Sequence, residues 1–518
     1  MNIKFYSIGA IMAMAGCTSQ AEKKLPNIII ILADDMGYGD ISALNENSRI
    51  QTPHLDVMAR DGLVFTDAHT SSSVSTPSRY GLLTGRYSFR TWLKQGVLQG
   101  YTTAPGVLEG GLCLDATPLI DASRPTLGTM LSAQGYHTAC IGKWHLGWDW
   151  AYKPDSKDVD FTKPIGGGPT TRGFDYFFGI VASLDMPPYV YVENDMPTAV
   201  PDRWFPGGKD HLMCREGEQA PDFDFDDVLP NFIRHSEKFI YEHQNSSKPF
   251  FLYLPLNSPH TPILPTEEFK GASGLNPYGD FVVMTDHMVG RIVKAVKESG
   301  QWENTIIIFT SDNGCSPGFV DWNYLTSRGH NPSYIFRGAK RDIWDGGHRV
   351  PFIVTWGDRY KGKREEGIVC LTDFYATFAQ MTGYKIADNE AEDSYSFLPA
   401  LTGKGRPKRT DVVHQSSEGF LALREGDWKM NFCAGSGGPP RQAGAKAAKG
   451  QPDYQLYNMK DDPSETNNLY EANPEMARRL ASKMVKYIEE GRSTPGKPQA
   501  NDTERWNQLE SIYKLAGK

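Results

Sequence analysis

Four short runs of apolar, mostly β-branched or aromatic residues constrain the fold of this chain most strongly. They are residues 27–33 (NIIIILA), 249–256 (PFFLYLPL), 304–311 (NTIIIFTS) and 350–356 (VPFIVTW). None shows a steady polar–apolar alternation, which indicates strands buried on both faces. Helical patterns, such as those at 127–134 and 279–297, lie between them. We therefore expect an α/β fold with a large, doubly wound mixed sheet flanked by helices.

The sequence changes character after about residue 405. Segments 412–415, 420–423 and 428–432 have the pattern of short antiparallel strands, and the Gly/Ala/Pro/Lys-rich stretch 434–450 has that of a mobile loop. Asn473 and Pro474 then start a helix with one apolar face, which Gly491 ends. We expect a main domain over residues 26–405 and a smaller α+β subdomain over residues 406–518, a division that the length of 518 residues allows.

The first residues have the pattern of an export signal. Lys4 is followed by an apolar stretch, and the small residues Ala15 and Gly16 precede Cys17. This ending resembles the lipobox of bacterial lipoproteins, which implies a signal peptide over residues 1–16, a lipid on Cys17 and a tether over residues 17–25. An ordinary secretory signal with a chance cysteine is the alternative. No other run approaches the ~18 apolar residues of a membrane helix, so we expect an exported protein that contacts a membrane only through its lipid anchor.

An acidic cluster after Cys17, of the kind associated with surface export in some bacteria, is missing from the sequence. This favours the periplasmic side of the outer membrane, or the periplasm. Six further cysteines permit disulfides in an exported chain, but no CxxC spacing supports a pairing or a zinc site, and their connectivity cannot be read. They are Cys113, Cys140, Cys214, Cys315, Cys370 and Cys433.

The charge balance bears on the partners of the chain. Lys and Arg number 54 against 62 Asp and Glu, a net charge of −8, which does not favour nucleic-acid binding. An anionic substrate therefore requires a local basic pocket.

Acidic pairs directly follow two of the apolar runs. Asp34 and Asp35 come after residues 27–33, and Asp312 and Asn313 come after residues 304–311. Ligands gather at the carboxyl ends of the strands in such sheets. Oxygen ligands without thiolate or imidazole suit a hard divalent cation. Each pair taken alone could be a turn or a helix cap, but four such side chains at the ends of two core strands favour the metal site.

The segment from Ser75 to Arg86, STPSRYGLLTGR, is the most specific motif. A helix start capped by Ser75 explains the serine and Pro77 but leaves Arg79 and Arg86 unexplained. The segment resembles the signature of type I, formylglycine-dependent sulfatases of the alkaline-phosphatase superfamily: Cys/Ser-x-Pro-Ser/Ala-Arg, then Gly-Arg. The resemblance covers most of residues 26–356 and continues more weakly to the C terminus. It implies an alkaline-phosphatase-like fold whose catalytic domain is the main domain.

In that family the first residue of the motif is oxidised to formylglycine, and the hydrated aldehyde is the nucleophile. The resemblance therefore implies conversion of Ser75 to 3-oxoalanine by an anaerobic-type sulfatase-maturating enzyme, since the motif starts with serine. It also implies one Ca²⁺ ion as cofactor. Its ligands would be Asp34, Asp35, Asp312, Asn313 and the modified Ser75.

Other family positions match residues elsewhere in the chain. Lys143 and His145 lie in GKWHLG; two residues apart, they share one side of an extended segment. The resemblance implies that Arg79 and Lys143 activate the nucleophile and that His145 accepts a proton from it. A solvated lysine and a core histidine are the alternatives. His260, assisted by Lys340, would protonate the leaving oxygen, and Ser183 would contact the sulfate.

The stretch 329–351 resembles bacterial carbohydrate sulfatases. Asp345, His348 and Arg349 are predicted to bind the sugar, with a salt-bridged turn as the equal alternative; Arg172, Asp175 and His414 are weaker candidates. We expect an exo-acting enzyme on sulfated galactose or N-acetylgalactosamine, at O6, in a glycosaminoglycan or mucin-type glycan. N-acetylglucosamine sulfate is the nearest alternative.

Two other classes of protein remain at this point. A phosphomonoesterase or phosphodiesterase of the same superfold usually requires a second metal with a histidine-rich ligand set, which the sequence does not offer. A glycan-binding lipoprotein without activity is the other class, if Ser75 is not modified.

Overall fold

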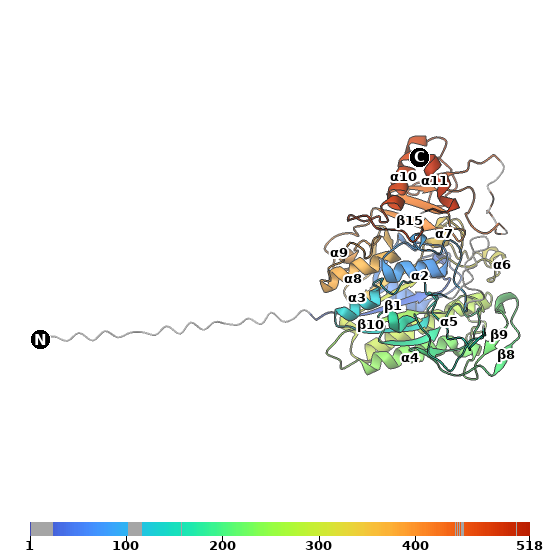
Figure 1. Cartoon of the computed structure of the whole chain (residues 1–518), viewed down its shortest axis with the longest axis vertical. Helices are drawn as coiled ribbons and strands as arrows, with labels where there is room; N and C mark the ends of the chain where they lie inside the picture. The colour runs from blue at the N-terminus through green and yellow to red at the C-terminus, as the bar shows by residue number, and fades with distance from the viewer. Residues whose placement is uncertain are drawn as a thin grey trace.

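A ten-stranded mixed sheet forms the centre of the main domain (Figure 1). The computed structural model describes residue 1 and residues 24–101, 117–156, 158–440, 442, 444, 446, 450–503 and 505–518. In spatial order the strands are β13 (Lys363–Glu365), β2 (Leu63–Phe65), β12 (Phe352–Trp356), β11 (Thr305–Ser311), β1 (Asn27–Ala33), β10 (Phe250–Pro255), β4 (His137–Lys143), β5 (Tyr176–Ile180), β6 (Val192–Glu193) and β7 (Met196–Pro197).

The middle of this sheet is parallel and fully buried. β1 pairs with β10 on one side and β11 on the other, and β4 and β5 continue the parallel order. Every residue of β1 is buried, because helices cover both faces of the sheet. This confirms the interpretation of the continuous apolar runs. β12 differs: it runs antiparallel to β11, which makes the sheet mixed.

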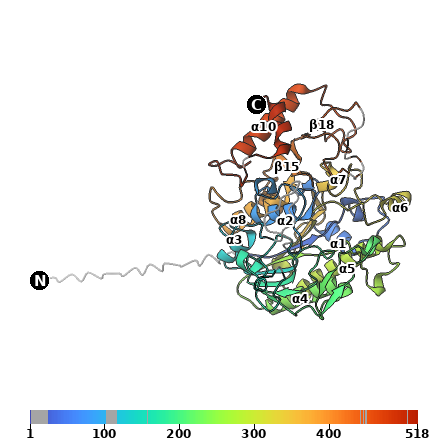
Figure 2. The same cartoon turned by 45° about the vertical axis from the view of Figure 1, so that its right-hand side comes forward.

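Helices lie on both sides of the sheet, as a doubly wound fold requires. α1 (Pro53–Asp61), α4 (Val228–Glu242) and α5 (Pro277–Glu298) pack together, and α2 (Ser75–Thr84), α3 (Leu127–Ala133) and α8 (Phe374–Thr382) form a second group. Figures 1 and 2 place α4 and α5 on one side of the strands and α2, α3 and α8 on the other. The shorter elements are β3 (Ala68–His69) paired with β14 (Val369–Cys370), β8 (Arg203–Phe205) paired with β9 (Gly217–Gln219), α6 (Trp322–Ser327), α7 (Asp345–His348) and α9 (Leu398–Leu401).

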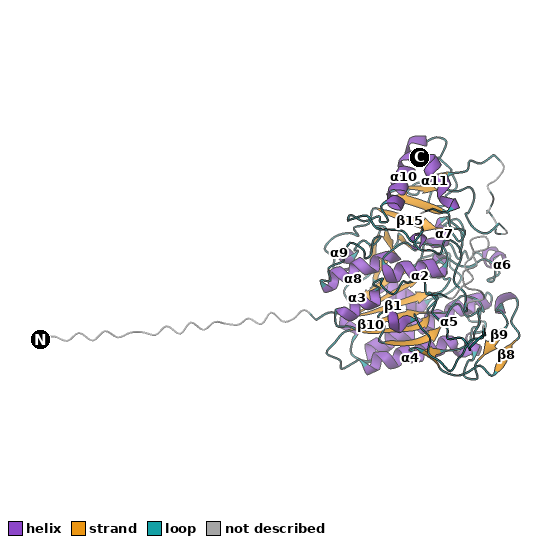
Figure 3. Ribbon diagram, in the orientation of Figure 1, coloured by secondary structure: helices purple, strands orange, loops and turns teal. Residues whose placement is uncertain are grey.

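The C-terminal part is a small α+β unit (Figure 3). A four-stranded antiparallel sheet has the order β15 (Asp411–Gln415), β16 (Leu421–Glu425), β17 (Trp428–Asn431) and β18 (Gln455–Asn458). α10 (Pro474–Glu489) starts after Asn473 as predicted and packs with α11 (Glu510–Ala516). Their apolar core includes Tyr87 and Phe89 of the main domain, so this core continues into the larger unit.

Several expectations concern residues outside the described ranges. These are the signal peptide, Cys17, most of the tether, Cys113 and parts of the stretch 434–450. The five described cysteines are all buried and free of disulfides. Among the described helices, none combines the length and the apolar character needed to cross a membrane.

Candidate active site

Two acidic pairs meet where the central strands end. β1 and β11 pair in register up to Ala33 and Ser311, so the residues that follow them lie level. The chain turns at Asp35, which has a left-handed φ of 63°. The Asp35 N–H donates to Asp312 Oδ1 at 3.1 Å. The amide of Asn313 donates to Asp35 Oδ1 at 2.7 Å, which fixes the amide orientation. The predicted juxtaposition of these residues is confirmed.

Ser75 is the first residue of α2, and its hydroxyl faces these acidic groups. The N-cap position is Val74, and no side chain caps the helix, so the simple capping role is excluded. Ser75 Oγ lies 3.4 Å from Asp34 Oδ1 and 3.4 Å from Asn313 Oδ1. Lys143 Nζ lies 3.5 Å from the same oxygen.

Three buried cations neutralise the three carboxylates. Arg79, one turn after Ser75, donates to Asp312 Oδ2 at 2.8 and 3.0 Å and to Asp34 Oδ1 at 3.3 Å. Lys143 Nζ donates to both oxygens of Asp34, at 2.7 and 2.8 Å. Lys340 Nζ donates to Asp35 at 2.7 Å. The three cations and three carboxylates of this cluster balance in charge, so a divalent cation held by the carboxylates would give it a net charge of +2 and favour an anion.

The electrostatics keep Asp34 ionised. Burial raises the pKa of this carboxyl group, but the charges of Lys143, His260 and Arg79 outweigh burial and lower the pKa to about 2. Burial also lowers the pKa of Lys143, while Asp34 acts in the opposite direction. Asp34 is therefore a permanent oxygen donor at neutral pH.

Two histidines flank the cluster. His260 follows β10, and its Nε2 lies 3.7 Å from Asp35 Oδ2, while Nδ1 contacts the carbonyl of Thr261. His145 Nε2 lies 2.9 Å from the carbonyl of Leu98, and its Nδ1 is buried without a partner among the described residues. Burial, then Lys143 and Arg79, lower the pKa of His145 well below its usual value. β4 ends at Lys143 and His145 has a φ of 57°, so the prediction that both share an extended segment was wrong.

The donor set fits a divalent cation. The Ser75 Oγ distances of 3.4 Å are long for hydrogen bonds between oxygens, which cluster near 2.7–2.8 Å. Carboxylate, amide and hydroxyl oxygens of this kind would suit a hard divalent cation. Ligand atoms of Asp34, Asp35 and His260 lie within 4.8 Å of one another.

Ser183 lies in a segment that is hydrogen-bonded to the backbone of His145. It follows β5 and stands two residues after Val181, whose carbonyl accepts the His145 N–H at 2.9 Å. Its side chain is buried. This position is compatible with the predicted sulfate contact.

The structure does not bring the predicted sugar-binding residues to this cluster. Asp345 and His348 are 0% exposed; Asp345 forms ion pairs with Lys429 at 2.8 Å and with Arg349 at 3.2 Å. The substrate-binding interpretation of Asp345 and His348 is therefore contradicted, because an enclosed side chain offers no surface to a sugar. Arg349, still partly exposed, belongs to the same salt-bridged turn.

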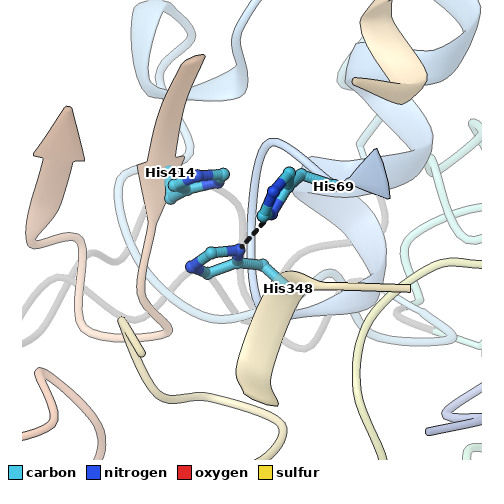
Figure 4. A group of neighbouring side chains, drawn as sticks. All are labelled: His69, His348 and His414. Atoms are coloured by element: carbon cyan, nitrogen blue, oxygen red, sulfur yellow. Dashed lines mark hydrogen bonds between the residues drawn. The ribbon is translucent and has the colours of Figure 1, made fainter. Parts of the chain in front are cut away.

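The weaker candidates also have structural partners. Arg172 donates to the carbonyl of Ile120 at 2.7 Å, and Asp175 accepts the N–H of Thr138 at 3.0 Å. His414 stacks on His348 inside the molecule (Figure 4). Lys429, Glu465 and His69 enclose Asp345 and His348, but no local motif in the sequence marks them.

Comparison with known proteins decides the family. The family model described as "Sulfatase" matches residues 26–384. The chain belongs to the sulfatase family. It is 32% identical to an N-acetylgalactosamine-6-O-sulfatase of Bacteroides thetaiotaomicron, over 91% of this chain and 96% of that protein, and 29% identical to human arylsulfatase A, over 88% and 86%.

A solved structure supports the same assignment. It comes from work on the metabolism of multiple glycosaminoglycans by Bacteroides thetaiotaomicron and superposes on this sulfatase with a TM-score of 0.78. The identity is 30%, covering 90% of this chain and 99% of that one. This sulfatase is therefore a sulfuric ester hydrolase. The family uses a formylglycine residue and a metal ion.

Proposed function

We propose that this sulfatase removes the 6-O-sulfate from N-acetylgalactosamine or galactose at the end of a glycosaminoglycan or mucin-type glycan. The N-acetylgalactosamine-6-O-sulfatase of Bacteroides thetaiotaomicron, similar over nearly its whole length, supports the sugar and the position. The observation that carries the proposed chemistry is the Ser75 hydroxyl, enclosed by Asp34, Asn313 and Lys143 within 3.5 Å.

The proposed metal ion is one Ca²⁺, held by Asp34, Asp35, Asp312, Asn313 and the modified Ser75. The carboxylate and amide oxygens near Ser75 support a hard cation such as calcium.

Formylglycine at position 75 supplies the nucleophile, and the ion supplies positive charge beside it. Arg79 and Lys143 hold the carboxylates in place and add their own charge where negative charge develops on the sulfate. Their burial strengthens this effect, because no water screens them.

The two histidines have separate proton-transfer roles in this proposal. His145 Nε2–H donates to the Leu98 carbonyl, so the buried Nδ1 carries a lone pair and accepts a proton from the nucleophile. Its lowered pKa keeps it neutral and ready to accept. His260 Nδ1–H donates to the Thr261 carbonyl, so His260 acts as the acid in its imidazolium form, whose second proton on Nε2, near Asp35, passes to the leaving sugar oxygen. Lys340, bonded to Asp35, supports that side of the site, and Ser183 contacts the sulfate.

The biogenesis of the enzyme is part of the proposal. An anaerobic-type maturating enzyme oxidises Ser75, since the motif starts with serine. The sequence of residues 1–25 supports export with a lipid on Cys17 and a periplasmic or outer-membrane location facing the periplasm.

A panel of defined substrates tests the proposal. Purified enzyme is incubated with 6-O-sulfated N-acetylgalactosamine, galactose and N-acetylglucosamine, and with a matching phosphate ester, beside the Ser75→Ala variant. We expect sulfate release from the first two sugars and none from the variant. Fastest turnover of the N-acetylglucosamine sulfate contradicts the sugar assignment, and phosphate turnover above sulfate turnover contradicts the reaction. An oligosaccharide with sulfates along its length distinguishes exo action, because only its terminal sulfate is then released.

A further inference from the structure

Three buried histidines meet between the main sheet and the C-terminal sheet, away from the acidic cluster. His69 belongs to β3, His348 to α7 and His414 to β15 (Figure 4). All three are 0% exposed. His69 Nδ1 and His348 Nδ1 lie 3.2 Å apart, and the rings of His348 and His414 stack with centroids 3.5 Å apart and planes 10° from parallel.

The partners of His69 set the direction of the hydrogen bond between the first two rings. His69 Nε2 lies 2.8 Å from Asp67 Oδ1 and therefore donates. The neutral ring then has no proton on Nδ1, so His348 Nδ1–H donates to it at 3.2 Å. His348 Nε2 lies 3.2 Å from Lys429 Nζ, a donor, and 3.1 Å from the Ile343 carbonyl, an acceptor. Two imidazoles, those of His69 and His348, thus link Asp67 to Lys429, and His414 stacks on the second of them.

The surrounding charges balance without a charge on the histidines. The carboxylates that face the cluster are matched in number by cations, and each cation bonds to at least one of them. Burial lowers the pKa of all three imidazoles, which keeps them neutral. The carboxylates are Asp67, Asp345 and Glu465, and the cations are Arg349, Arg424 and Lys429.

Three histidines also have the composition of a metal centre, but their geometry is that of a hydrogen-bond network. In-plane lone pairs of two stacked rings run side by side and do not converge on one point. The ammonium group of Lys429, 3.2 Å from His348, adds repulsion for a second cation.

This network holds the segment that leads into Ser75. His414 Nδ1–H donates to the Thr70 carbonyl at 3.0 Å, and the Thr70 N–H donates to the His348 carbonyl at 2.8 Å. Ser73 N–H donates to the Gln415 carbonyl at 3.0 Å, and its own carbonyl accepts the Arg341 N–H at 2.9 Å. α2 begins two residues after Ser73, and Lys340 precedes Arg341. The same backbone bonds therefore fix both sides of the acidic cluster.

We propose that His69, His348 and His414 are positioning residues that set the place of Ser75 relative to Lys340 through the segment 70–73. The inference rests on the proposed role of position 75 as the nucleophile. None of the three touches the substrate. Their effect is on alignment, where a displacement of about 1 Å costs about 100-fold in rate.

Two substitutions at His414 test the proposal. His414→Phe keeps a stacked ring and removes the donor to Thr70, while His414→Asn restores a donor close to the position of Nδ1. His287→Phe, at an exposed histidine of α5, is the matched control. We expect His414→Phe to lower kcat about 10- to 100-fold per formylglycine-containing chain with KM changed less than about twofold. His414→Asn should recover most of kcat, and the control should match the wild type.

Two further measurements distinguish a positioning role from misfolding and do not depend on the proposed function. Mass spectrometry gives the formylglycine content, and hydrogen exchange at Thr70 and Ser73 reports the segment even in an inactive chain. Faster exchange in His414→Phe than in His414→Asn, at similar Tm, supports the positioning role. Unchanged exchange and a kcat within twofold of the wild type overturn it. One metal ion per chain that His414→Phe removes, but Asp312→Ala does not, also overturns it. If the fully converted wild type shows no sulfatase activity, the proposed function is wrong, while the exchange measurements still test the positioning role of the histidines.

Discussion

Replacement of Lys143 by Met tests the electrostatic balance of the site. Lys143 Nζ lies 2.7 and 2.8 Å from the two oxygens of Asp34, and both side chains are fully buried. The substitution leaves Asp34 with Arg79 at 3.3 Å. Removal of one partner from a buried ion pair costs about 3–5 kcal/mol. With an unfolding entropy of about 2.1 cal/mol/K per residue over the matched residues 26–384, Tm should fall by about 4–7 °C in chelator.

Added calcium should reverse part of this loss. The variant has one cation fewer beside the same three carboxylates and should bind a divalent ion more tightly, and tighter binding to the folded chain gives a larger rise in Tm. Scanning calorimetry in chelator and at increasing calcium measures both terms. Lys486→Met, at an exposed lysine 3.9 Å from Glu490, is the control and should shift Tm by less than about 1 °C. Equal Tm values in chelator, or a calcium-induced shift no larger than in the wild type, would show that Lys143 does not offset the charge of Asp34.

Three further predictions address the nucleophile, the metal ion and pH. Ser75→Ala should abolish turnover while changing stability by no more than about 1 kcal/mol, since this serine makes no capping bond; a circular-dichroism melt far below that of the wild type would count against the catalytic role. Asp312→Ala should lose both bound calcium and activity; elemental analysis checks the first, and full activity after exhaustive chelation contradicts the metal assignment. The free energy of unfolding should fall as pH drops below 6.5, because burial lowers the pKa of His69, His348 and His414 in the folded state and the unfolded chain then binds more protons. Each histidine contributes up to about 1.4 kcal/mol per pH unit to this decrease in the free energy of unfolding. Urea titrations in which the free energy of unfolding does not fall at acid pH contradict the assignment of neutral histidines.

The sequence predicted the parts of the fold that local pattern determines. β1 and β11 were predicted because an unbroken apolar run has only one environment, a strand covered on both faces. The location of the acidic residues after these strands could also be predicted, because the carboxyl ends of neighbouring parallel strands lie at the same edge of a sheet. The strand β18 and the helix α11 were not predicted, because each is short and its apolar residues pack only through distant partners.

The sugar-binding prediction failed for a non-local reason. Asp345 and His348 have the composition of an exposed polar turn, but Lys429 of β17 and Glu465 enclose them from sequence positions about a hundred residues away. His145 illustrates a smaller error: nothing in GKWHLG marks the residue at which β4 ends and the chain turns. The burial of a side chain and the handedness of a turn depend on packing between distant segments. Neither can therefore be read from one segment of the sequence.

The mass of the peptide that contains Ser75, measured in enzyme purified from an anaerobic host alongside its sulfatase rate, tests the central claim most directly. If formylglycine at position 75 is the nucleophile, this peptide is lighter by two hydrogens, in an amount that rises in proportion to the rate of sulfate release across preparations. Full sulfatase activity in a preparation whose Ser75 peptide has the mass of unmodified serine would contradict it.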